Sequence, residues 1–135
     1  MRGEIKRGVA TVSNTYNTIE KLKSRKLIGQ LFDGGKTVSK FPVKIIYKKV
    51  DFEDEVLLKV GVSVSKRNFK HAVDRNRIKR LLRETYRLNK QLLHKDVTEK
   101  HVCMILYLGK KTPEYEVLNT IMVSLLQQLN EKINS

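Results

Sequence analysis

The segment from Asp74 to Leu93 restricts the fold more than any other, because its residues separate into two faces at helical spacing. At about 100° per residue, the apolar side chains fall in one arc and most of the cationic ones in another. The apolar arc comprises Ile78, Leu81, Leu82, Thr85, Leu88 and Leu92. The cationic arc comprises Arg75, Lys79, Arg80, Arg83, Arg87 and Lys90. The pattern predicts a long helix with one packed face and one basic face.

Three strands are predicted around this helix. Apolar residues alternate with other residues in 41–47 and again in 58–64, which is typical of half-buried strands. The acidic segment 51–55 lies between the two strands, so they are predicted to pair as a hairpin. The continuous apolar run Val102–Leu108 predicts a strand buried on both faces.

Capping residues predict two further helices. The first follows Ser24 and ends before Gly34, since a serine at the start and a glycine past the end are common helix boundaries. Its apolar positions are Leu27, Ile28, Leu31 and Phe32. The last helix opens with Thr112 as its cap and Pro113 in its first position. Its apolar face comprises Leu118, Ile121, Met122, Leu125 and Leu129.

The order helix, strand, strand, helix, strand, helix predicts an α+β domain of the αββαβα type, with a small sheet of three or four strands. We expect the helices on one side of the sheet and a free binding face on the other. Residues 18–135 are predicted to form this single domain. Residues 1–17 lack apolar periodicity and are predicted to be a flexible arm.

The charge balance predicts a polyanionic partner. The chain carries 28 Lys and Arg against 14 Asp and Glu, a formal net charge of +14, which is more than solubility requires in a small domain. Nucleic acid is the expected partner, and an anionic membrane is the rival. No apolar run approaches the roughly 18 residues of a membrane span, and the N-terminus lacks the apolar core of a secretory signal. A transit peptide is the alternative there.

The basic face of the helix has two interpretations, a binding surface or a solvated face. Glu84 is the only carboxylate between Arg75 and Lys95, whereas a merely soluble helix mixes signs. Like charges four residues apart cost an isolated helix a few tenths of a kcal/mol per pair, and an anionic ligand would remove that cost. Arginine also suits bidentate phosphate contacts. The composition therefore favours binding.

Catalytic and metal-binding patterns are not evident in the sequence. Nucleases use convergent carboxylates with Mg²⁺, or paired histidines. The acidic residues 51–55 cluster in a turn, and His71, His94 and His101 lack metal-ligand spacing. Cys103 is the only cysteine and excludes an internal disulfide, which is consistent with a reducing cytoplasm. We therefore expect a cytoplasmic protein without an active site of its own.

Two runs resemble a known family. Val62–Arg67 (VSVSKR) and Ala72–Glu84 (AVDRNRIKRLLRE), including Arg75-Asn76-Arg77, are similar to the signature of the bacterial ribonuclease P protein. The resemblance extends weakly over 22–129. It implies a left-handed strand–helix–strand crossover, against the usual right-handed rule. It also implies that the protein assists a catalytic RNA, which removes the 5′ leader of precursor tRNA with Mg²⁺ held by the RNA-containing complex and not by a protein-only site.

The resemblance further implies which residues bind RNA. The residues expected to contact ribonuclease P RNA are Lys66, Arg67, Arg75, Asn76, Arg77, Lys79, Arg80, Arg83 and Arg87. A cleft between the first helix and the sheet is expected to hold the single-stranded leader. Its residues are Ile28, Phe32, Lys44 and Tyr47. Phe32 and Tyr47 could stack on bases, but their ordinary role at such spacing is in a core.

The sequence also departs from the family pattern. Ile28 stands where the family commonly has Phe, so apolar contact is expected there in place of stacking. The segment 69–71 replaces a usual Gly-Asn, and whether His71 takes over the Asn contact stays open. Two other functions remain as alternatives: a general or ribosomal RNA-binding module, and a DNA-binding protein that inserts the basic helix in a major groove. The second lacks the helix-turn-helix neighbour expected for such docking.

Overall fold

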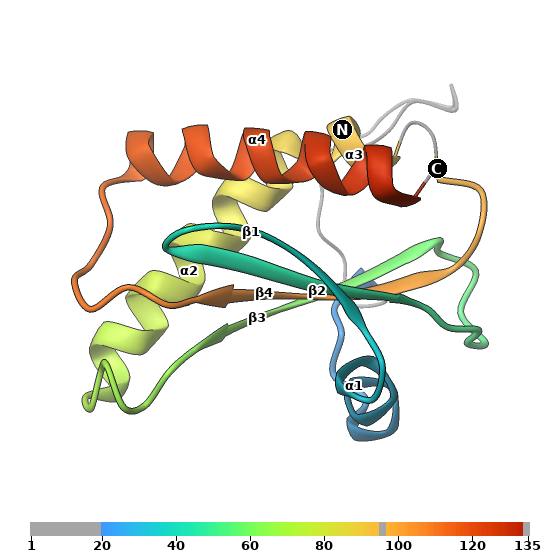
Figure 1. The fold of residues 1–135 in the computed structure, drawn as a ribbon. Helices are drawn as coiled ribbons and strands as arrows, with labels where there is room; N and C mark the ends of the chain where they lie inside the picture. Colours follow the sequence, from blue (N-terminus) through green and yellow to red (C-terminus); the bar gives the residue numbers. More distant parts are fainter. Residues whose placement is uncertain (1–19, 95–96, 134–135) are drawn as a thin grey trace, which may run out of the picture.

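The computed structural model describes residues 20–94 and 97–133, so the predicted arm at 1–17 lies outside the described residues. The elements in chain order are α1 (Arg25–Phe32), β1 (Lys36–Lys40), β2 (Val43–Lys49), β3 (Leu58–Val64), α2 (Ala72–Asn89), α3 (Gln91–His94), β4 (His101–Tyr107) and α4 (Tyr115–Ile133). They form a four-stranded sheet with helices, which confirms the α+β prediction (Figure 1). No helix in the described ranges is long and apolar enough to cross a membrane.

The strand order in the sheet is β1-β2-β4-β3, and this order contradicts the predicted hairpin. β4 lies between β2 and β3, antiparallel to the first and parallel to the second. In its centre Ile105 pairs with both Ile45 and Val62. A strand with apolar residues on both faces is most stable in the middle of a sheet, where both faces are covered. The true hairpin partner of β2 is β1, which sequence periodicity missed because only Val38 in it is buried.

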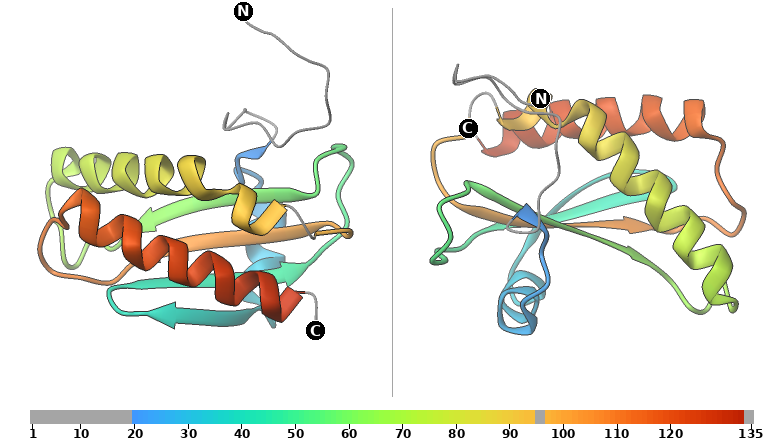
Figure 2. Two further views of the ribbon diagram at one scale, coloured as in Figure 1. Left: turned by 90° about the horizontal axis from the view of Figure 1, so that it is seen from above. Right: turned by 180° about the vertical axis from the view of Figure 1, so that it is seen from behind.

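The crossover from β3 through α2 to β4 is left-handed, as the resemblance implied. Figure 2 (left) looks onto α2 and α4, with β3 and β4 running in the same direction beneath them. When this view is turned so that both strands point upward, with the helices toward the reader, β4 lies to the left of β3. Most such connections have the opposite hand. With this hand of the crossover, α2 extends past β3, the outermost strand of the sheet.

Helices cover both faces of the sheet. α2 and α4 pack on one face over the main core, and α1 lies against the other (Figure 1). The smaller core beneath α1 is formed by Leu22, Leu31, Ile46, Val102 and Met104. The prediction of helices on one side only was therefore wrong. It overlooked that Ile46, Val102 and Met104 give the second face its own apolar surface.

The two faces of α2 follow the predicted arcs with exceptions at the C-terminal end. The buried residues are Ile78, Leu82, Thr85 and Tyr86. Leu88, predicted to be buried, is 37% exposed. Lys90, predicted to lie on the basic face, is 3% exposed, because α2 ends at Asn89 and the chain turns into α3 there. The geometry of a single straight helix does not apply past that break.

Lys90 forms a buried ion pair with Glu20. Its Nζ lies 2.5 Å from Oε1 of Glu20, and the two side chains are 3% and 9% exposed. The segment that follows Glu20 runs beside β3, where Lys21 bridges to Val60 and Leu22 N donates to Val60 O at 3.0 Å. The ion pair therefore fastens the start of the described chain to the end of α2.

The predicted cap of α1 is confirmed, whereas the predicted cap of α4 is wrong. Leu27 N donates to Ser24 Oγ at 3.3 Å, as expected of a serine cap. Gly34 has φ of 94°, which favours glycine after a helix. The predicted Thr112 cap is wrong, because α4 begins at Tyr115 with Leu118 N donating to Glu114 O. The predicted apolar face of α4 is buried throughout.

Candidate nucleic-acid interface

The loop from β3 to α2 is fastened to the end of β4. The Phe69 ring is buried and lies 6.1 Å from the ring of Tyr107, centroid to centroid. The side chain of Asn68 donates from Nδ2 to the carbonyl oxygens of Leu108 and Gly109, each at 3.3 Å. These two contacts hold the loop in position, and with it the adjacent side chains of Lys66 and Arg67.

The start of α2 is stabilised by Arg75. Its Nη1 donates to the carbonyl oxygens of Phe69 at 2.7 Å and Lys70 at 2.9 Å. Part of the guanidinium group is therefore engaged within the protein, which the assignment of Arg75 as an RNA contact did not foresee. His71 is the exposed residue before α2 and makes no side-chain capping bond. Whether it takes over the family's usual Asn contact stays open.

Most of the predicted RNA-contact residues have no side-chain partner among the residues that the structure describes. Seven of the nine side chains make no hydrogen bond or ion pair with the residues that the structure describes, and all but Lys79 among them are exposed. These seven residues, here called the basic surface, are Lys66, Arg67, Asn76, Arg77, Lys79, Arg80 and Arg83. They lie on the β3–α2 loop and along α2.

Arg87 differs from the basic surface because it is paired with Glu84. Its Nη2 lies 2.5 Å from Oε1 of Glu84. The hydrogen bond from Arg87 lowers the pKa of Glu84, and the same bond raises the pKa of Arg87. Exposed pairs of this kind add little stability. Glu84, the only carboxylate between Arg75 and Lys95, is thus used by Arg87, and the basic surface keeps its charge.

A small cavity beside α2 adds two lysines that the sequence interpretation missed. It has a volume of about 100 Å³, lies at the outer edge of β3, and is lined by Lys21, Lys23 and Arg83 among others. The bridge between Lys21 and Val60 brings the two lysines to this edge. Their only sequence signal was their basic character on either side of Leu22, which by itself does not place them next to α2.

The predicted leader cleft is only partly assembled. Ile28 packs at the margin of the core beneath α1, and Phe32 at the end of α1 is 52% exposed. Lys44 is half-buried and two residues from Ile46, so it lies on the same face of β2. Tyr47 is in the main core on the opposite face, and its grouping with the other three was wrong. The error concerns the face to which the Tyr47 side chain points, since neighbouring residues of a strand point to opposite faces.

Lys48 takes a structural part on the α1 face that the sequence interpretation did not foresee. Its Nζ donates to the carbonyl oxygens of Gln30 at 3.0 Å and Asp33 at 2.7 Å. These carbonyls lie at the C-terminal end of α1, where helix carbonyls lack partners and cations are favourable. Lys48 therefore positions α1 on the sheet, and with it Ile28 and Phe32.

The fold and this surface define a class of protein: a small α+β domain whose left-handed crossover helix carries a basic face that is largely without partners among the described residues. The family model described as Ribonuclease P matches residues 17–130. The chain belongs to this family, which confirms the resemblance found in the sequence.

Individual relatives agree with this assignment. The ribonuclease P protein component of Porphyromonas gingivalis is 39% identical over 83 residues, which cover 62% of this chain and 61% of that protein, somewhat less than two thirds of its length. The ribonuclease P protein component of Chlorobium phaeobacteroides is 33% identical over 129 residues, covering 86% of this chain and 88% of that protein.

Solved structures agree in fold. The RNase P protein of Thermotoga maritima matches with a TM-score of 0.65 at 19% identity, over 81% of this chain and 96% of that one. A Staphylococcus aureus RNase P protein mutant, described as having defective mRNA degradation activity, matches with a TM-score of 0.66 at 18% identity, over 82% and 88% of the two chains.

Proposed function

We propose that this protein is the protein subunit of ribonuclease P in the cytoplasm, where it binds the catalytic RNA and the 5′ leader of precursor tRNA and assists removal of the leader. The observation that carries the proposal is the basic surface. Its side chains have no counter-charge among the described residues, although they lie close together along one loop and one helix. Phosphates of an RNA would supply that counter-charge and release condensed ions on binding.

We assign two sides of the protein to two parts of the RNA substrate complex. The basic surface, with Arg75 and Arg87 beside it, would contact ribonuclease P RNA. The α1 side, with Ile28, Phe32 and Lys44, would contact the leader. Lys21 and Lys23 lie near Arg83 at the edge of β3, and they extend the cationic area toward the α1 side. A single RNA–leader path along this edge would use all of these groups.

We assign the chemistry to the RNA subunit and its Mg²⁺ ions. Two carboxylates of the acidic segment 51–55 are already paired with lysines. Asp54 forms an ion pair with Lys59, and Asp51 lies 3.8 Å from Lys100. Burial raises the pKa of the Cys103 thiol to about 12, so it is not a nucleophile at neutral pH. These groups suit a structural part better than a catalytic one.

The decisive experiment adds the purified protein to a bacterial ribonuclease P RNA at low Mg²⁺ and follows precursor tRNA cleavage. We expect stimulation that disappears when the RNA is left out. Tight RNA binding without stimulation, for several such RNAs, would favour a general or ribosomal RNA-binding module. Competition by duplex DNA that exceeds competition by RNA would instead indicate a DNA-binding protein.

The leader assignment predicts the effect of Phe32→Ala. Because the Phe32 side chain is 52% exposed, its truncation is expected to leave the melting temperature nearly unchanged. Loss of a base-stacking platform is expected to weaken precursor tRNA binding by about 1–3 kcal/mol, while mature tRNA binding is unaffected. Equilibrium binding of both tRNAs to the reconstituted complex measures this. A drop in melting temperature with no change in the preference for precursor would place Phe32 in the core.

A further inference from the structure

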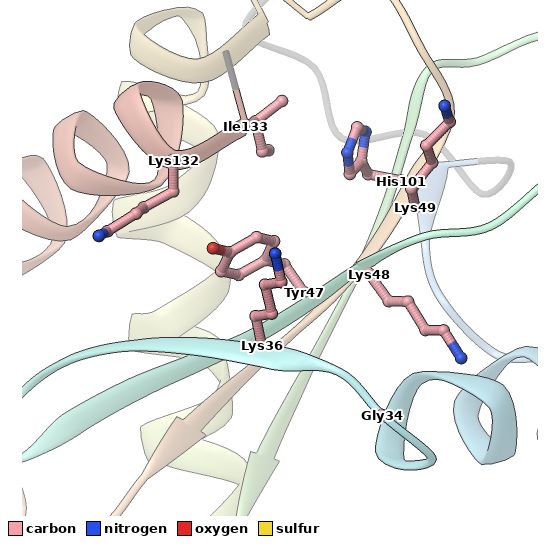
Figure 3. Close-up of a pocket in the computed structure, with 8 residues that line it drawn as sticks. All are labelled: Gly34, Lys36, Tyr47, Lys48, Lys49, His101, Lys132 and Ile133. Atoms are coloured by element: carbon pink, nitrogen blue, oxygen red, sulfur yellow. The ribbon is translucent and has the colours of Figure 1, made fainter. Parts of the chain in front are cut away.

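A second cationic site lies at the other end of the sheet from the β3–α2 loop. It is a cavity of about 250 Å³, where the C-terminal end of α4 approaches β1 and β2, and its lining also includes Gly34 and Lys48 from the α1 side (Figure 3). His101, the first residue of β4, lines it, whereas the β3–α2 loop is fastened just beyond the last residue of that strand. The length of β4 therefore separates the two sites, roughly 20 Å at the rise of a strand.

The fold brings three lysines of this cavity together from distant parts of the sequence. Lys36 of β1 is the register partner of Tyr47, and Lys49 lies two residues along the same face of β2. Lys132 approaches from the last turn of α4. Lys49 pairs with Glu99, whose pKa the hydrogen bond from Lys49 lowers. None of the described residues that line the cavity is acidic, so the lining itself is cationic.

The hydroxyl group of Tyr47 is the second observation that indicates a ligand. Tyr47 is 7% exposed, yet its hydroxyl makes no hydrogen bond with the residues described by the structure. Figure 3 shows the hydroxyl pointing toward the α4 side of the pocket, with the Lys36 and Lys132 side chains on either side of it in this view. A hydroxyl that lacks a protein partner needs water or a ligand as its partner, since polar groups in folded proteins are normally satisfied.

The protonation state of Tyr47 suits a donor. Burial raises the pKa of its hydroxyl, and the neighbouring Cys103 adds to the effect. The hydroxyl therefore keeps its proton at neutral pH and can donate it to an anion. The ammonium groups of Lys36 and Lys132 are donors as well, so the three groups offer hydrogens and positive charge to one small acceptor.

We propose that this pocket binds a phosphate group through the Tyr47 hydroxyl and the ammonium groups of Lys36 and Lys132. The cavity volume is below the range of about 300–1,000 Å³ that holds drug-sized ligands. It therefore fits one phosphate and the atoms next to it better than a whole nucleotide. The phosphate can come from the backbone of an RNA strand or from a free inorganic species such as pyrophosphate. This site does not depend on the function proposed above.

The test follows backbone amide resonances of the full chain by NMR during two separate titrations, one with pyrophosphate and one with a short oligouridylate. The variants are Tyr47→Phe, which removes only the hydroxyl, and Lys36→Ala. Lys40→Ala is the matched control, since Lys40 is an exposed lysine at the other end of the same strand. Melting temperatures of all variants establish that each one folds.

We expect shifts at the amides of residues 47, 49 and 101, with a Kd that Lys36→Ala raises about tenfold and Tyr47→Phe severalfold. Lys40→Ala should leave this Kd unchanged. Shifts with the oligouridylate identify a phosphodiester as the ligand, and shifts with pyrophosphate alone identify a free phosphate. Absence of shifts at this pocket with both ligands overturns the proposal, as does an equal effect of Lys36→Ala and Lys40→Ala. Neither of these two results bears on the cleavage assay with ribonuclease P RNA, which tests the proposed function separately.

Discussion

Replacing Arg77, Arg80 and Arg83 together by alanine is expected to weaken binding to ribonuclease P RNA roughly 10- to 100-fold near physiological salt. Each side chain is exposed and makes no hydrogen bond or ion pair with the described residues, so its loss removes an RNA contact without exposing a core. If each arginine touches one phosphate, the slope of log Kobs against log salt should become shallower by about 0.9 per contact, close to three units in all. Filter binding at several salt concentrations measures both quantities.

The control for this variant removes the same charge from other faces. Arg25 and Lys26 lie exposed on α1, and Lys40 lies on the edge strand β1. Replacing these three residues by alanine should change the salt slope much less. A third variant with lysine at 77, 80 and 83 should keep most of the slope but lose affinity, because lysine lacks the bidentate geometry of arginine. Equal slopes for the first two variants would mean that the basic face of α2 is merely solvated.

Replacing Lys90 by alanine is expected to destabilise the fold by about 3–5 kcal/mol, because it leaves the Glu20 carboxylate buried without its partner. Small domains are stable by only about 5–15 kcal/mol, so this is a large share. The corresponding fall in melting temperature is roughly 10 °C or more. Urea denaturation measures the free energy of unfolding directly. RNA binding, measured well below the melting temperature, should be nearly unchanged, since Lys90 is not on the surface.

Two comparisons make the Lys90 prediction specific. Lys49→Ala removes a lysine from an ion pair whose side chains are 66% and 55% exposed, and it should cost at most about 1 kcal/mol. The double variant Glu20→Leu/Lys90→Met replaces both buried charges by apolar groups and should recover most of the stability lost in the single variant. If Lys90→Ala costs no more than Lys49→Ala, the buried pair does not hold the start of the chain to α2.

The strand errors show what local patterns lack. Periodicity found β2, β3 and β4, because each carries apolar residues on at least one face. It missed β1, whose single buried residue is Val38, and it joined β2 to β3 although β4 separates them. Pairing between strands depends on which surfaces remain to be covered after all the elements assemble, and no window of neighbouring residues contains that information.

The site residues divide in the same way. Lys79, Arg80 and Arg83 of the basic surface followed from the helical period of 74–93, because positions on one helix have fixed angles to each other. The other four residues of the basic surface came from the resemblance to the family. Tyr47 was assigned to the wrong face of β2, since the structure places it in the main core. A motif resemblance can be off by one residue along a strand, and a shift of one residue reverses the face to which a side chain points. Arg75 and Arg87 lie in the predicted arc, yet their contacts with Phe69 and Glu84 are visible only in three dimensions.

The sequence by itself determined the α+β class, the one-sided basic helix and the family, since these depend on composition, local periodicity and a contiguous motif. Only the tertiary structure decided that β4 separates β2 from β3, that α1 covers the second face, and that Lys90 is buried against Glu20. It also brought Lys36, Tyr47 and Lys132 to one pocket. The physical reason is that burial and charge pairing act between residues that are distant in the chain, so their outcome depends on the assembled fold.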